Sequence, residues 1–140
     1  MIPAMVTLLE QQESFRSKPY RDSLGFLTIG FGTNLDAGIT REQADALMEI
    51  ALRDNLAQLL SLSWFAGLDP VRQSVVENMA YNMGVDGVLE FRDMIAAIEA
   101  QDWSEAAHQM LASKWATQVG ERARVLAGIM ESGKMPDAAI

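Results

Sequence analysis

The stretch from Glu13 to Thr33, ESFRSKPYRDSLGFLTIGFGT, most constrains the fold because it cannot continue the helix expected before it. Pro19 lacks the backbone N–H that a helix interior needs. Beyond it, three glycines between Gly25 and Gly32 separate short runs of alternating apolar residues, a pattern typical of a small antiparallel sheet. After Thr40, apolar residues recur at three- and four-residue spacing, which indicates helices. The sequence therefore predicts an α+β fold with a small N-terminal β-hairpin or sheet lobe and a larger helical lobe.

Capping signals set the boundaries of the expected helices. Thr40 and Gln43 match the capping-box pattern, Asp69-Pro70 places an N-cap before a proline in the first helical position, and Gly84 ends the helix that follows. A loop through Gly87 is expected next. The expected helices cover Met5 to Gln12, about 40–61, 70–83, Phe91 to Ala100, 103–113 and 121–130.

These elements suggest one domain over residues 1–140. In this arrangement the long helix at about 40–61 bridges an N-terminal β lobe at about 13–39 and a helical lobe at about 62–140. We expect a cleft between the two lobes, because two lobes joined by one helix leave room for a ligand between them.

Composition excludes several classes of function. At 140 residues with 49% hydrophobic content, the chain is long enough for one core, and the absence of cysteine excludes disulfides and thiolate chemistry. A formal net charge of −8 argues against a nucleic-acid partner, which requires clustered lysine and arginine. The sequence opens without the pattern of a secretory signal and has no run of about 20 apolar residues, so we expect no export by itself and no membrane insertion.

Two carboxylates and a hydroxyl in the N-terminal stretch are candidates for catalysis. Glu13 lies at the end of the opening helix, where the negative end of the helix dipole favours a protonated carboxyl. Asp22 lies in a turn, and only the break between them lets the two groups face each other, since nine residues of continuous helix would separate them by about 13 Å. One protonated and one ionised carboxylate can hydrolyse a glycosidic bond, and the Thr28 hydroxyl could hold the attacking water.

Residue types alone also permit purely structural roles for these groups. Glu13 could be a solvated helix terminus, and Asp22 could build its turn by accepting local backbone hydrogen bonds. An acidic protein contains many carboxylate pairs at such separations. Spacing by itself therefore leaves both interpretations open.

Three groups of residues, which follow one another along nearly the whole chain, together form a recognisable pattern. They are Glu13, Tyr20-Arg21-Asp22, Gly25 and Thr28-Ile29-Gly30-Phe31-Gly32; then Asn78-Met79-Ala80-Tyr81-Asn82-Met83-Gly84; then Phe91, Trp103, Glu105-Ala106-Ala107, Trp115 and Arg122-Ala123. This order strongly resembles that of the phage-type lysozymes, the muramidase endolysins that cut bacterial peptidoglycan. The resemblance implies a lysozyme-like α+β fold without metal or organic cofactor.

The resemblance also implies a role for each candidate. Glu13 would be the general acid, Asp22 the second carboxylate and Thr28 the hydroxyl that positions water in an inverting mechanism. The other implied site residues are Tyr81 and Asn82 along the saccharide cleft, Gln109 and Lys114 on the opposite wall, and Arg122 as the cation that orients Glu13.

One position departs from the family pattern. After Gly32 the family usually has a histidine that braces the active-site strand through a buried ion pair, whereas this chain has Thr33. Neutral packing or hydrogen bonding can replace such a pair at no intrinsic cost when both partners change together. If the change instead loosens Glu13, activity would be low.

The expected protein is thus a monomeric endolysin that hydrolyses the β-1,4 bond between N-acetylmuramic acid and N-acetylglucosamine and lyses the host cell. It would stay in the host cytoplasm until a holin permeabilises the membrane, and then reach the periplasm and cell wall. A lytic transglycosylase, which needs one catalytic acid, is the alternative that Asp22 and Thr28 argue against. A non-catalytic peptidoglycan-binding or virion structural module stays open because of Thr33 and the acidic charge.

Overall fold

The computed structural model describes residues 1–137, which form two compact units. The first unit comprises Met1–Leu47, and the second comprises Met48–Ile140 as far as the described residues extend. The boundary falls inside helix α2 (Arg41–Leu59). Each unit has its own secondary structure and is described by itself.

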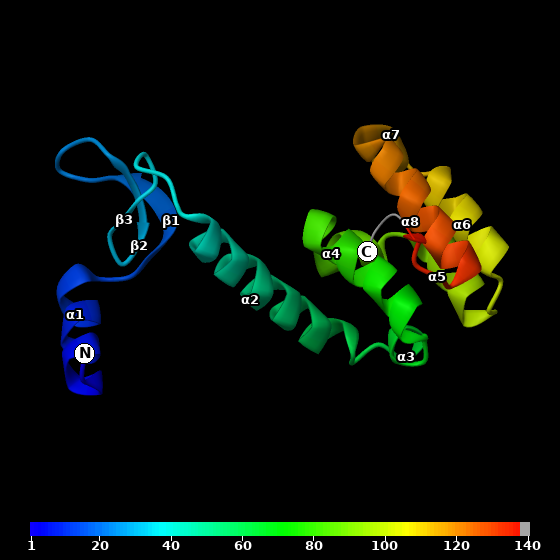
Figure 1. Cartoon of the computed structure of the whole chain (residues 1–140), viewed down its shortest axis with the longest axis horizontal. Coiled ribbons are helices and arrows are strands. Elements are labelled where there is room, and N and C mark those ends of the chain that lie inside the picture. The colour runs from blue at the N-terminus through cyan, green and yellow to red at the C-terminus, as the bar shows by residue number, and fades with distance from the viewer. Residues whose placement is uncertain (138–140) are drawn as a thin grey trace. The chain divides into compact units, whose positions relative to one another are not determined.

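The first unit contains a helix followed by a small sheet, as predicted (Figure 1). Helix α1 (Pro3–Glu13) ends where Ser14 adopts a positive φ of 60°. Strands β1 (Arg16–Arg21), β2 (Leu27–Gly30) and β3 (Thr33–Asn34) then pair antiparallel in the order β1-β2-β3. In this register Thr28 lies opposite Tyr20 on one side and Asn34 on the other. The predicted α+β fold class is therefore confirmed.

A capping box starts helix α2, as the sequence predicted. The Thr40 backbone N–H donates to Gln43 Oε1 at 2.9 Å, and the Gln43 N–H donates to Thr40 Oγ1 at 3.1 Å. These two reciprocal bonds satisfy backbone donors that the first helical turn leaves without partners. The observed end at Leu59 lies close to the expected one.

The second unit is entirely helical among its described residues. Beyond the last part of α2 it contains α3 (Ser63–Ala66), α4 (Pro70–Leu89), α5 (Arg92–Glu99), α6 (Trp103–Leu111), α7 (Lys114–Val119) and α8 (Glu121–Ser132). Four of these were expected from the sequence, whereas α3 and α7 were not. Both have fewer than two turns, so neither is long enough to show a helical period in its sequence.

Helix α4 corrects one expectation. Gly84 departs from helical geometry with φ 81° and ψ 160°, as a helix-ending glycine would, but the chain resumes a helix up to Leu89. The predicted loop through Gly87 is therefore wrong. The reason is packing, because Val85 and Val88 are both buried and continue the apolar face of α4 into the core.

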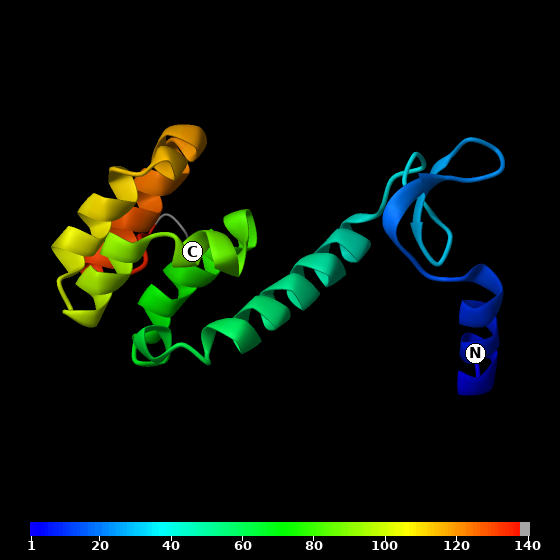
Figure 2. The same ribbon diagram turned by 180° about the vertical axis from the view of Figure 1, so that it is seen from behind.

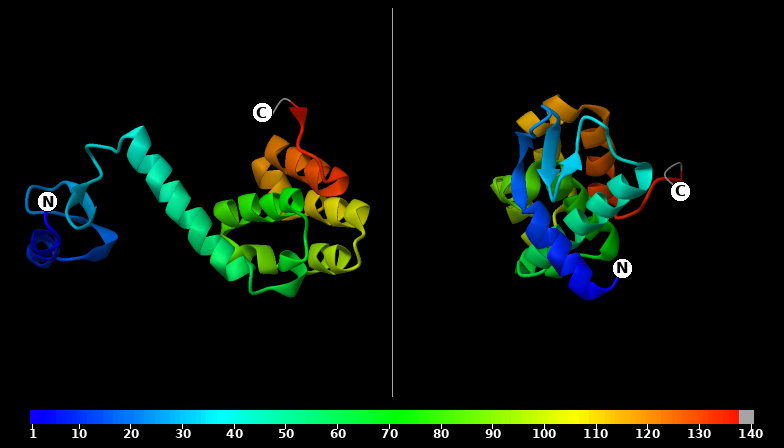
Figure 3. Two further views of the ribbon diagram at one scale, coloured as in Figure 1. Left: turned by 60° about the horizontal axis from the view of Figure 1, so that its bottom comes forward. Right: turned by 90° about the vertical axis from the view of Figure 1, so that its left-hand side faces the viewer.

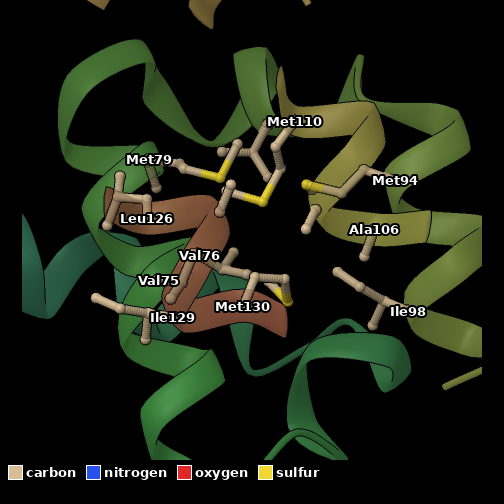
Figure 4. Packing of buried hydrophobic residues seen from close by; sticks show 14 of the residues in the cluster. Val75, Val76, Met79, Met94, Ile98, Ala106, Met110, Leu126, Ile129 and Met130 are labelled. Carbon is tan, nitrogen blue, oxygen red and sulfur yellow. The ribbon is translucent and has the colours of Figure 1, made fainter. Parts of the chain in front are cut away.

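The core of the second unit lies where α4, α5, α6 and α8 meet. Helix α6 contacts both α5 and α8, which lie beside it in Figures 1 and 2, and the left view of Figure 3 shows α4 next to α8. Figure 4 shows the packed side chains, among which Met79, Met94, Met110 and Met130 are fully buried. Flexible thioether side chains fill irregular gaps between helices, so these methionines act as core residues.

Candidate active site

Glu13 is the last residue of α1, where the sequence placed it. Its side chain lines a hollow of about 290 Å³ in the first unit, together with Val6, Leu9, Glu10, Phe31 and Gly32. The carboxylate lies against Gly32: a Cβ atom built on that glycine would be 3.0 Å from Glu13 Oε2. A ligand that enters this hollow would meet the Glu13 carboxyl group.

Asp22 follows β1 and builds the hairpin turn with one of its two oxygens. Its Oδ1 accepts hydrogen bonds from the N–H groups of Leu24 and Phe26, both at 2.9 Å. Its own N–H donates to the Phe26 carbonyl at 2.9 Å. The structural role that the sequence left open is therefore present. Among the described residues Oδ2 has no hydrogen-bond partner, so this oxygen is free to accept a proton.

Thr28 lies on β2 and is 3% exposed, which makes it a buried polar residue of the first unit. Its hydroxyl donates to the Phe26 carbonyl at 2.9 Å, the same oxygen that accepts the Asp22 N–H. The backbone of Asp22 and the side chain of Thr28 thus meet at one carbonyl oxygen. Because the hydroxyl hydrogen is committed, Thr28 Oγ1 can act towards a ligand only as an acceptor.

Asp36 supports this arrangement and was missed by the sequence analysis. Its Oδ2 accepts from the Leu27 N–H at 2.8 Å and lies 3.5 Å from Arg21 Nη1, which also donates to the Gly25 carbonyl at 3.2 Å. Asp36 therefore ties the loop after β3 to the start of β2. An aspartate in a loop beside an edge strand is the signal that could have suggested it.

In the second unit, Tyr81 and Arg122 line one hollow of about 500 Å³. The Arg122 guanidinium donates to Asn78 Oδ1 at 2.7 and 3.2 Å and to the Asn78 carbonyl at 3.3 Å. Glu77 lines the same hollow, where burial raises the pKa of its carboxyl. Asn78 was part of the recognised motif but had no assigned role. The pairing of Arg122 with Glu13 stays a prediction, since the two residues belong to different units.

Gln109 and Lys114 line a second hollow of the same unit, of about 540 Å³. Trp115 contributes to its wall, although only 6% of this residue is exposed, and its indole N–H donates to Asn82 Oδ1 at 2.8 Å. Phe91 packs edge-on against Trp115 with ring centres 6.0 Å apart. Trp115 is therefore a packing residue that also holds the Asn82 side chain through this hydrogen bond.

No group of three or more His, Asp or Glu side chains in residues 1–137 comes together in a way that could hold a metal ion. None of the helices described is both long enough and apolar enough to cross a bilayer.

The family model of phage lysozymes matches residues 10–132, a span that includes every candidate site residue. The chain belongs to the phage lysozyme family. The resemblance inferred from the sequence and the lysozyme-like fold class are therefore confirmed. Membership of the phage lysozyme family also supports a muramidase-type function.

Three relatives of this phage lysozyme family member are similar over most of its length. Probable T4-type lysozyme 1 of Dictyostelium discoideum is 25% identical over 96% of this chain and 98% of the relative. Probable T4-type lysozyme 2 of the same organism is 22% identical, over 98% and 99% respectively. The pre-baseplate central spike protein Gp5 of Enterobacteria phage T4 is 31% identical over 94% of this chain, but this covers only 28% of Gp5.

Proposed function

We propose that this protein hydrolyses the β-1,4 glycosidic bond between N-acetylmuramic acid and N-acetylglucosamine in bacterial peptidoglycan, with all 140 residues acting as one lysozyme domain. Membership of the phage lysozyme family supports the reaction class. The observation that carries the assignment of residues is the shared Phe26 carbonyl, which holds the Asp22 N–H and the Thr28 hydroxyl side by side.

In the proposed reaction, Glu13 gives its proton to the glycosidic oxygen as the bond from that oxygen to the anomeric carbon breaks. A water molecule attacks the carbon from the opposite face and forms the new C–O bond, so the configuration inverts. Before the attack, the water donates one hydrogen bond to the Asp22 carboxylate and another to Thr28 Oγ1. Both acceptors leave a lone pair of the water directed at the sugar, and Asp22 then takes the proton.

The residues of the second unit bind substrate in this proposal. Tyr81 and Asn82 contact the saccharide, and Gln109 with Lys114 holds a further part of the chain in the hollow that they line. Arg122 orients the Glu13 carboxylate. No metal or organic cofactor takes part.

We further propose that the protein is a monomeric endolysin. It is made in the host cytoplasm, depends on a holin to pass the membrane, and acts on the cell wall to lyse the host. Membership of the phage lysozyme family supports the reaction, but it does not bear on how the protein reaches the cell wall.

Replacement of Glu13 by glutamine tests the proposed reaction. We expect Glu13→Gln to lower the rate of reducing-end release from purified peptidoglycan by at least about a hundredfold, because glutamine cannot donate the proton, while the helical circular dichroism stays unchanged. Glu10→Gln is the matched control, since it removes a carboxylate from the same helix without removing the acid. Equal release by the native protein and Glu13→Gln would place the acid elsewhere.

Product analysis separates the enzymatic alternatives. A hydrolase adds water to its product, whereas a lytic transglycosylase leaves an anhydro sugar, so the two differ in product mass. Nuclear magnetic resonance of the first product anomer formed tests inversion. An anhydro product would replace the hydrolase by the transglycosylase.

The similarity to Gp5 favours one further candidate, a wall-binding or structural module of a phage particle. The name of that relative places it in a central spike, and this chain corresponds to only 28% of it. Binding to peptidoglycan by the native protein without any release of reducing ends would support this candidate over the enzyme.

A further inference from the structure

Gly32 lies in the short turn between β2 and β3, directly against the Glu13 carboxylate. A Cβ atom on this residue would be 3.0 Å from Glu13 Oε2 and 3.8 Å from its Cδ. Real Cβ atoms rarely approach a neighbour so closely, so any side chain at this position would require the carboxylate to move. Gly32 also has a φ of 87°, in the region that favours glycine.

A second, independent contact joins the same two segments. Phe15, two residues after Glu13, packs against Phe31, the residue before Gly32, with ring centres 5.5 Å apart and an interplanar angle of 50°. This aromatic pair holds the end of α1 beside the turn between β2 and β3. The backbone that carries Glu13 is therefore held close to the turn that contains Gly32.

We propose that Gly32 is a positioning residue for Glu13: the missing side chain leaves the space in which the acid lies, and the Phe15 and Phe31 rings keep the two segments together. This inference rests on the proposed role of Glu13 as the general acid. In this proposal the glycine lies against the acid and does not bind the substrate. It acts by fixing where the proton donor stands, and a displacement of about 1 Å at such a group can cost about a hundredfold in rate.

The test compares Gly32→Ala with Gly38→Ala. Gly38 belongs to the same unit and has a similar φ of 80°, but a Cβ atom there would have no neighbour within 4 Å. Both variants place an alanine at a positive φ, so we expect similar losses in melting temperature. The Glu13 carboxylate is the end of a flexible side chain and can move at little energetic cost. The contact should therefore add little to the loss of stability of Gly32→Ala.

The two variants should differ in catalysis. We expect kcat of Gly32→Ala on soluble peptidoglycan fragments to fall about a hundredfold with KM unchanged, whereas Gly38→Ala keeps the native kcat. Equal kcat values in the two variants would overturn the proposal, and so would a rise in KM alone, because it would make Gly32 a substrate-binding residue.

Combination with Glu13→Gln distinguishes this inference from the proposed function. Once the acid is absent, Gly32→Ala should cause no further loss of the residual rate. An additional loss equal to that seen in the native background would overturn the positioning role. Full activity of Glu13→Gln by itself would instead refute the acid assignment. An inactive Glu13→Gln with an unimpaired Gly32→Ala would refute only the role of Gly32.

A measurement on the native protein covers the case in which Gly32→Ala does not fold. A nuclear Overhauser effect between the Hα protons of Gly32 and the Hγ protons of Glu13 is expected from their contact. Its absence, with the Phe15 and Phe31 ring signals well resolved, would overturn the proposal.

Discussion

The two carboxylate oxygens of Asp22 differ in their contacts. Oδ1 accepts the Leu24 and Phe26 N–H groups and so holds the hairpin turn, while Oδ2 has no partner among the described residues. The two interpretations that the sequence left open are thus compatible, because they concern different atoms. Asparagine retains an acceptor oxygen at the position of Oδ1 but offers no base.

Two variants of Asp22 should therefore separate its roles. We expect the free energy of unfolding of Asp22→Asn to lie within about 0.5 kcal/mol of the native value, since the turn keeps both hydrogen bonds. Its rate of hydrolysis should nevertheless fall at least about a hundredfold. Asp22→Ala should lose about 1–2 kcal/mol of stability as well, because two backbone donors lose their partner. Chemical denaturation and reducing-end release measure the two effects. A fully active Asp22→Asn would leave Asp22 with the turn alone.

The residues of the candidate site differ in how far they could be predicted. The turn at Asp22 and the helix end at Glu13 are local features, and the sequence indicated both. The hydrogen bonds of Arg122 with Asn78, and the approach of Glu13 to Gly32, join residues that local patterns do not relate. The resemblance predicted Arg122 as a site residue, but no pattern in the sequence around Arg122 predicts Asn78 as its hydrogen-bond partner.

At the scale of elements, Arg72 joins three helices of the second unit. Its guanidinium donates to the Met130 and Glu131 carbonyls at the end of α8, at 2.6 and 3.0 Å, and lies 4.0 Å above the ring of Trp103 on α6. It also donates to Asp69 Oδ1 at 3.1 Å at the start of α4. Only 12% of the Arg72 side chain is exposed. The Asp69 cap of α4 is thereby connected to the C-terminal end of α8.

This connection changes the titration of Asp69. Burial alone raises the pKa of the Asp69 carboxyl, but hydrogen bonds from the backbone N–H and guanidinium of Arg72, together with its positive charge, outweigh burial and hold the pKa below its ordinary value. A carboxylate with a lowered pKa stabilises the folded protein above its unfolded pKa of about 3.9. That stabilisation is lost as the pH falls through the folded-state pKa.

Asp69→Asn should reveal this contribution, because asparagine still caps the helix but carries no charge. At pH 7 we expect a loss of about 0.5–1 kcal/mol, a small value because 39% of the Asp69 side chain is exposed and solvent screens the pair. The difference from the native protein should shrink below about pH 4 and vanish at lower pH. Urea unfolding over a pH series measures it.

Asp54→Asn is the control for the loss of one carboxylate from an ion pair, since Asp54 and its partner Arg53 are both largely exposed. This variant should lose little stability at pH 7. A difference between Asp69→Asn and the native protein that stayed constant down to pH 2 would show that the charge of Asp69 contributes nothing.

Some of the predicted helices have a capping residue at their start, whereas α5 and α8 were predicted without one. Capping residues mark α2, α4 and α6, and each begins where the signal places it. The short helices α3 and α7 carry too few turns for a period. The resumption of α4 after Gly84 depends on where Val85 and Val88 pack, which is a property of the assembled core.

At the scale of the whole molecule, the acidic charge is unevenly distributed. The first unit has four Lys and Arg against six Asp and Glu, whereas the second has seven against thirteen. Most of the excess negative charge thus belongs to the unit that carries Tyr81, Asn82, Gln109 and Lys114. Bacterial walls are often anionic, so their approach to this unit is opposed by repulsion between like charges.

We therefore expect lysis of intact cells to improve when salt or divalent cations are added, because the Debye length falls from about 10 Å at 0.1 M to about 3 Å at 1 M ionic strength. Cleavage of a neutral soluble oligosaccharide should change much less under the same conditions. Turbidity and reducing-end assays across a salt series provide the comparison. A steep decline of lysis with rising salt would contradict the expectation and indicate an attractive surface.

The divided use of Asp22 also bears on how such a protein can diverge. An aspartate codon becomes an asparagine codon by one nucleotide substitution, and this exchange spares the atom that builds the turn. With Asp22 as the proposed base, the gene lies one mutational step from a gene for a folded domain that no longer cleaves its substrate. Selection for attachment or assembly, once cleavage is no longer needed, can act on that domain without first having to rebuild a damaged fold.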